Sequence, residues 1–62
     1  MKLVYLISTR NKGKDPNLYF INFKDKKGSI EIAKEMVNDI TILYELDEDI
    51  NTKFKEIYRK EL

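Results

Sequence analysis

The chain contains no cysteine and no histidine, and both absences limit how a protein of 62 residues can be stabilised. Without cysteine no disulfide can form, and without either residue the common zinc frameworks are missing. A domain of this length buries only about 60% of its unfolded surface, so it usually needs such a reinforcement. Self-association is the means that remains, and we expect a single domain over residues 1–62 that oligomerises.

The same two absences count against catalysis. Acid–base and nucleophilic mechanisms need a group that titrates near neutrality or an activated nucleophile. Carboxylates, lysines or tyrosines would have to replace them, with pKa values strongly shifted by burial in a cleft, which a domain this small rarely encloses. We therefore expect no enzymatic activity and no cofactor.

A metal site is also not expected, although one segment begins like a calcium-binding loop. Asp47, Asp49 and Asn51 match the first three ligand positions of that loop. Thr52 then stands where the loop requires glycine, and Tyr58 stands where it requires a chelating glutamate. Capping of a helix that begins after these acids explains them more simply.

Long apolar runs are missing too. The apolar stretch near the N-terminus ends at Ile7, before Ser8 and Thr9, which is too short for a secretory signal or a membrane span. We expect a cytoplasmic protein that does not bind membranes.

Two short apolar runs are present, at residues 3–7 and 18–23, and neither alternates with polar residues. Strands with this pattern are covered on both faces. A chain this short has little left to cover two faces of a sheet, so we expect a second copy or a partner protein to do so. The predicted oligomer interface consists of Val4, Tyr5, Leu6, Tyr19, Phe20, Ile21 and Phe23.

These runs predict strands over residues 2–9 and 17–24, joined by a polar hairpin loop. Gly13 can adopt positive φ in that loop, and Pro16 holds the residue before it extended. Ser29 is the expected N-cap of a helix, because apolar residues then recur on one side of a helical wheel. That stripe comprises Ile30, Ile32, Ala33, Met36, Val37 and Ile40.

Residues 40–46 are rich in β-branched and aromatic side chains, which favours a third strand. Continuation of the preceding helix through Tyr44 is the alternative interpretation. A second helix is expected after the acidic run at residues 47–49, because apolar residues recur there at helical spacing. They are Ile50, Phe54, Ile57, Tyr58 and Leu62.

The predicted fold is a small α+β domain of ββαβα order, completed by oligomerisation. Its three-stranded mixed sheet has the order 2-1-3, because the right-handed crossover leaves room for the first strand between the other two. The second strand would then be an edge that is apolar and lacks an internal proline. Edges of this kind invite pairing with another strand.

Charge is strongly segregated along the chain, although the net charge is only +1. Residues 1–28 carry +5, residues 29–49 carry −6 and residues 50–62 carry +2. This segregation suits head-to-tail or reciprocal pairing between copies. The candidate partner surface comprises the basic residues Lys12, Lys14, Lys24, Lys26 and Lys27 and the acidic residues Glu45, Asp47, Glu48 and Asp49.

We interpret the chain as a non-enzymatic, homo-oligomeric protein-interaction module. Its abundant lysine, isoleucine and asparagine have A/T-rich codons, which suggests a low-GC bacterium or one of its phages as the source. Together with the small size and the lack of catalytic residues, this suggests a phage or mobile-element product that inhibits a host protein. One alternative is a small nucleic-acid-binding regulator that uses Tyr19, Phe20 and Phe23 beside lysines, although near-neutral charge disfavours it. Another is an oligomer that sequesters a small anionic ligand between subunits, near Lys12, Lys14 or Lys24.

Overall fold

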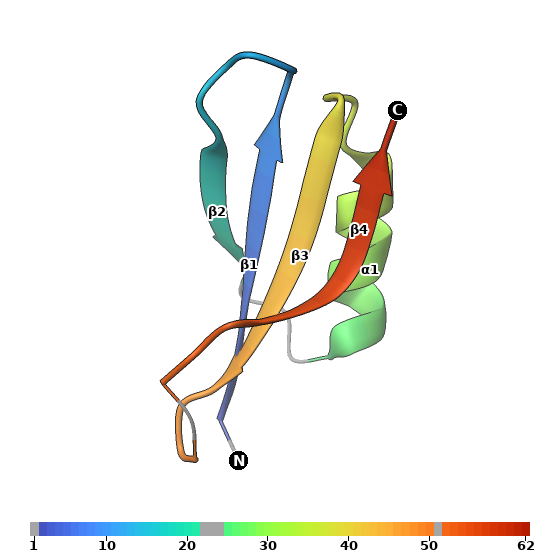
Figure 1. Cartoon of the computed structure of the whole chain (residues 1–62). Helices are drawn as coiled ribbons and strands as arrows, with labels where there is room; N and C mark the ends of the chain where they lie inside the picture. The colour runs from blue at the N-terminus through green and yellow to red at the C-terminus, as the bar shows by residue number, and fades with distance from the viewer. Residues whose placement is uncertain (1, 22–24, 51) are drawn as a thin grey trace.

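The computed structural model describes residues 2–21, 25–50 and 52–62, which form a four-stranded antiparallel sheet with one helix against one face (Figure 1). The strands are arranged in the order β2-β1-β3-β4, and every neighbouring pair is antiparallel. The elements along the chain are β1 (Leu3–Arg10), β2 (Asn17–Ile21), α1 (Lys26–Glu35), β3 (Ile40–Asp47) and β4 (Lys55–Glu61).

The N-terminal hairpin forms as its sequence predicts. Ile7 lies opposite Tyr19, and Thr9 lies opposite Asn17. Gly13 has a φ of 78° in the loop, a conformation that side chains with a Cβ rarely adopt. The described part of β2 ends at Ile21, so the predicted end of this strand, at residues 22–24, lies outside the described residues.

Asp39 ties the loop of this hairpin to the start of β3 and to the C-terminus, which lie at the same end of the sheet. The Lys12 amide donates to the Asp39 carboxylate at 2.9 Å, and the Asp39 amide donates to the Asn11 side-chain oxygen at 3.1 Å. The Leu62 amide also donates to the Asp39 carbonyl at 2.8 Å. These three bonds hold the loop, the α1–β3 connection and the C-terminus together.

Helix α1 begins earlier than Ser29, because Asp25 is its N-cap. The Asp25 carboxylate accepts a hydrogen bond from the Gly28 amide at 2.6 Å, which satisfies one of the free amides of the first turn. Ser29 is instead buried inside the helix, and its hydroxyl donates back to the Asp25 carbonyl at 3.2 Å. A serine hydroxyl in a helix often makes this backward contact, so the prediction that Ser29 caps the helix is wrong.

The helix also ends earlier than predicted. Met36 has an extended backbone, with ψ of 136°, and the Lys60 ammonium donates to the carbonyls of Lys34 and Met36 at the helix C-terminus. Three residues of the predicted stripe therefore lie beyond the helix. Met36 is its C-cap, Val37 is 86% exposed, and Ile40 begins β3.

The third strand is confirmed, and the alternative of a helix through Tyr44 is wrong. β3 pairs with β1 along its whole length, from Leu3 opposite Asp47 to Arg10 opposite Ile40. Because β1 lies between β2 and β3, the predicted order 2-1-3 of these three strands also holds.

The predicted ββαβα fold, with a three-stranded mixed sheet and two helices, is wrong. The last segment is strand β4, so the order is ββαββ and the sheet is entirely antiparallel. A register irregularity beside Leu43 and Tyr44 places Tyr58 opposite the first and Glu56 opposite the second, leaving Ile57 as the extra residue. Ile57 and Tyr58 both pack against the core, so the apolar pattern loses the alternation of a regular strand and resembles that of a helix.

The core lies between α1 and the sheet. Its fully buried hydrophobic residues are Tyr5, Ile7, Ala33 and Leu43, whose strand members occupy alternate positions on one face. The buried hydroxyls of Thr9 and Thr41, which lie opposite each other, share a hydrogen bond of 2.9 Å. The protein measures 35 × 21 × 15 Å, so it is a thin two-layer structure.

Candidate functional site

The sheet face opposite α1 is largely apolar, and the described residues place no helix over it (Figure 1). The register puts even-numbered residues of β1, β2 and β3 on this side, because their odd-numbered neighbours on β1 and β3 are buried under the helix. We call this surface the open face. It consists of Val4, Leu6, Leu18, Phe20, Ile40, Ile42, Tyr44 and Leu46, together with Phe54.

Phe54 joins the open face from the chain segment that leads into β4. Its ring centroid lies 6.5 Å from that of Phe20 on β2 and 6.5 Å from that of Tyr44 on β3. Leu6 on β1 lies opposite both Phe20 and Tyr44, so Phe54 bridges the two strands that flank β1. In Figure 1 this segment crosses over β3 and β1 on the side away from α1.

The open face remains accessible even with Phe54 in this position. Leu18 is 60% exposed, Phe20 is 68% exposed and Phe54 is 39% exposed. The other apolar members are half-buried. The face therefore carries more apolar residues than the fully buried core and leaves them in contact with water, an arrangement that marks interaction sites in soluble proteins.

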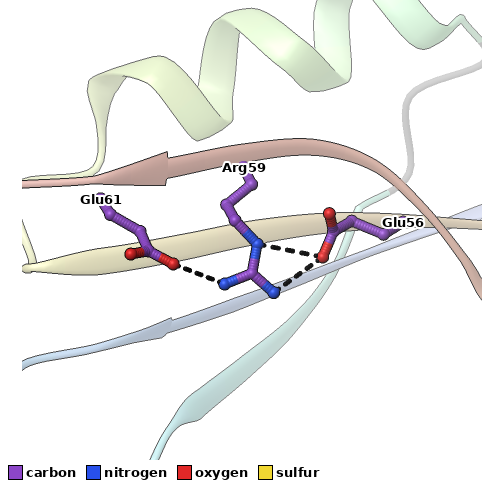
Figure 2. Close-up of polar contacts among 3 residues, drawn as sticks. All are labelled: Glu56, Arg59 and Glu61. Carbon is purple, nitrogen blue, oxygen red and sulfur yellow. Dashed lines mark hydrogen bonds and ion pairs between the residues drawn. The ribbon is translucent and has the colours of Figure 1, made fainter.

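Arg59 lies at the β4 margin of the open face, between two glutamates (Figure 2). Its Nε and Nη2 donate to Glu56 Oε1 at 3.2 and 2.8 Å, and its Nη1 donates to Glu61 Oε1 at 2.6 Å. Hydrogen bonding to Glu56, and then to Glu61, raises the pKa of Arg59 above its usual range. The charges at this margin are thus paired within one chain.

The residues predicted for the interface divide between the two faces of the sheet. Val4, Leu6 and Phe20 lie on the open face. Tyr5, Tyr19 and Ile21 lie on the helix-covered face, where Tyr5 is buried. Phe23 lies outside the described residues.

Six open-face members were not part of the predicted interface, and Leu18 on β2 is one of them. Four of them follow an apolar period of two along β3, at Ile40, Ile42, Tyr44 and Leu46, and this period was the signal that could have identified them. Phe54 reaches the face through a long-range contact that no local pattern encodes.

Tyr19 and Phe20 point to opposite faces of the sheet, as neighbouring residues of a strand do. They do not form one aromatic platform of the kind on which sheets stack bases. Phe23 and Lys24, the other residues considered for that role, lie outside the described residues.

The acidic run stabilises the β3–β4 turn, and the prediction that it caps a helix is wrong. The Asp47 carboxylate accepts from the Asp49 amide at 3.1 Å, and Glu48 pairs with Lys2 at 3.2 Å. Glu45, on the helix-covered face, lies opposite Tyr5.

The Tyr5 hydroxyl is buried, and no group among the described residues hydrogen-bonds to it. Burial and the neighbouring Glu45 carboxylate raise the pKa of Tyr5 to about 12, because both disfavour the phenolate. This hydroxyl therefore stays protonated at neutral pH and is a poor general base.

Within the described ranges, no group of three or more His, Asp or Glu side chains is placed to hold a metal ion. The helix found there is also too short and too polar to cross a membrane.

Comparison of the chain with protein-family models, with curated proteins and with solved structures gives no match. Its function is therefore inferred from its own residues.

Proposed function

We propose that the protein is a homodimeric protein-interaction module in which the open faces of two copies pack against each other. The observation that carries this proposal is the apolar open face itself. Stable domains cover each apolar sheet face with another layer, and here one chain supplies a layer for one face only.

The composition of the open face fits a second copy as its occupant. The face presents apolar residues from β1, β2, β3 and the segment before β4, and an identical copy brings the same apolar surface to the contact. A two-fold dimer would place this surface against an identical one and join two two-layer proteins into a four-layer assembly.

The charges around the open face also fit a self-complementary contact. Arg10 and Arg59 lie on this side, as do Glu56 and Glu61, so the positive and negative groups balance. Arg59 is already paired with both glutamates. A copy of the same neutral, apolar surface can approach without leaving a charge of one sign unpaired.

The test compares two exposed apolar residues, one on the open face and one off it. Sedimentation velocity at micromolar concentration should show a dimer for the natural chain and a monomer for Phe20→Lys. Val37→Lys is the matched control, because Val37 is 86% exposed and lies between α1 and β3. A natural chain that stays monomeric at millimolar concentration, or a Phe20→Lys variant that stays dimeric, contradicts the proposal.

Inhibition of a host protein is the more specific form of this proposal, supported only by composition. A pull-down from the lysate of a low-GC bacterium tests it, with Phe20→Lys and Val37→Lys as paired baits. Nucleic-acid binding is less well supported, because Tyr19 and Phe20 face opposite ways. A salt-dependent shift of labelled DNA or RNA would favour that function instead.

A further inference from the structure

The two edge strands of the sheet differ in how well they are protected. β4 carries charged side chains at five of its seven positions and is paired irregularly with β3. Charges and bulges are the devices by which proteins block unwanted pairing at a sheet edge. β2 has neither: its sequence is Asn-Leu-Tyr-Phe-Ile, and Leu18, Tyr19 and Phe20 are 60%, 48% and 68% exposed.

We propose that the free edge of β2 binds an extended, acidic segment of a partner protein as a fifth strand. The inference concerns a surface distinct from the open-face contact, because strand addition uses the backbone of β2 and not the face of the sheet. Along the side of β2 away from β1, backbone groups of alternate residues lack a strand partner among the described residues. β2 spans five residues, about 17 Å, which sets the length of the partner's paired core.

The acidic character of the partner follows from the charge of the segment that contains β2. Residues 10–28 carry six basic and two acidic side chains, a net charge of +4. Lys12 and Lys14 lie in the loop that leads into the strand; both are exposed and form no ion pair among the described residues. Lys26 and Lys27 begin α1, which packs against β1, β3 and β4, so they do not flank this edge. A segment with acids at one end would meet the loop lysines where the edge begins.

The same charges favour a foreign acidic segment over a second copy as the occupant of this edge. Two β2 strands paired antiparallel about Tyr19 would bring no acidic side chain of β2 to the loop lysines, because Asn17–Ile21 contains none. An acidic segment supplies the charge that a second β2 lacks.

The edge is also held ready to bind. Asn11 and Lys12 are both hydrogen-bonded to Asp39, so the start of the β1–β2 loop is fixed before any partner arrives. Binding to a preformed edge loses less conformational entropy than folding a loop on contact. Side chains of the added strand would alternate between the open-face side, beside Leu18 and Phe20, and the side of Tyr19.

The probe is a blocked nine-residue peptide with a Val-Thr-Val-Thr-Val centre and two glutamates at each end. One control replaces the four glutamates with lysines, and the other N-methylates all five central residues, which removes their hydrogen-bond donors. In fluorescence anisotropy at low salt, the acidic peptide should bind at least tenfold more tightly than either control. Equal binding of the N-methylated peptide, or no binding of the acidic one, overturns the proposal.

Variants and amide spectra locate the contact. Lys12→Glu combined with Lys14→Glu should weaken binding of the acidic peptide at least tenfold, whereas Lys34→Glu on α1 should not. NMR should show slower hydrogen exchange at amides of residues 17–21 when the peptide is bound. Slower exchange at β4 instead of β2 would show that the peptide binds the other edge. Slower exchange at β2 when only the protein concentration is raised would show that a second copy occupies this edge.

Sedimentation of the same samples separates this inference from the proposed dimer. Peptide binding by a monomeric protein supports the edge site and contradicts the open-face dimer. A dimer that does not bind the peptide supports the open-face dimer and contradicts the edge site.

Discussion

The two faces of the sheet are built from neighbouring residues of the same strands, yet they end in different environments. On β3, Leu43 is fully buried beneath α1, whereas Leu46 lies on the open face and is half-buried. On β1, Tyr5 and Ile7 are buried while Val4 and Leu6 are not. An apolar run thus shows that both faces will avoid water, but it does not show which face the chain itself will cover.

Truncation of a core residue should produce the largest difference in stability between the helix-covered face and the open face. Leu43→Ala removes a fully buried side chain and should lower the free energy of unfolding by about 2–5 kcal/mol, enough to unfold much of a domain this small. Leu46→Ala is the matched variant on the open face and should cost less. Urea melts at two protein concentrations measure both.

The dependence on concentration sharpens this comparison. If the open face is a dimer contact, the cost of Leu46→Ala should grow at concentrations where the natural chain is dimeric, because the dimer adds stability by mass action. Equal costs of both substitutions at every concentration would mean that the two faces contribute alike within a monomer.

A smaller effect is expected at the polar layer of the covered face. Thr9→Val or Thr41→Val leaves the other buried hydroxyl without its partner and should cost about 1–3 kcal/mol. The double variant should cost less than the sum of the two, since it leaves no buried hydroxyl of this pair unpaired. A double-mutant cycle by chemical denaturation gives the coupling.

Much of the covered face could be predicted from sequence. The hairpin is marked by two apolar runs around a polar loop, and the helix and the third strand each carry a clear local period. The order of the three strands was predicted from a right-handed crossover. β4 could not be predicted, because Ile57 and Tyr58 are adjacent and both face the core across a register irregularity. The spacing of apolar residues along the chain cannot show that a neighbouring strand supplies the hydrogen bonds. The segment was therefore interpreted as a helix.

The open face was only partly predictable for a related reason. Apolar residues on β1 and β2 predicted an uncovered surface, but which of them would face α1 depended on a register that the whole sheet sets. Tyr5 was expected at the interface and lies in the core. Phe54 was expected on a helix and lies against Phe20 and Tyr44.

The pH dependence of stability should separate Tyr5, on the covered face, from the rest of the protein. Its pKa is raised to about 12 from the model-peptide value of 10.0, so its contribution is fully present below pH 10 and is lost as pH rises through 12. The free energy of unfolding that is lost through Tyr5 over this pH range is at most about 2–3 kcal/mol. Tyr5→Phe should therefore lose less stability than the natural chain between pH 10 and 12.

At pH 7 the same substitution should change stability little, because it removes a buried hydroxyl that has no partner among the described residues. Urea melts at pH 7, 10 and 12 measure both effects. An equal slope for the two proteins above pH 10 would show that Tyr5 ionises alike when folded and unfolded.

The smallest effect on the folded monomer is expected at the margin of the open face. Arg59 is paired with Glu56 and Glu61 at the surface, and exposed ion pairs contribute little because water and salt screen them. Arg59→Met should leave thermal unfolding of the monomer nearly unchanged. It would, however, leave two carboxylates unpaired beside the apolar surface, so it should weaken the open-face dimer, and Lys34→Met on α1 should not. Sedimentation equilibrium at low and high salt measures this difference. If Arg59→Met dimerises as tightly as the natural chain at both salt concentrations, the ion trio lies outside the contact and the dimer uses only the part of the open face nearer β2.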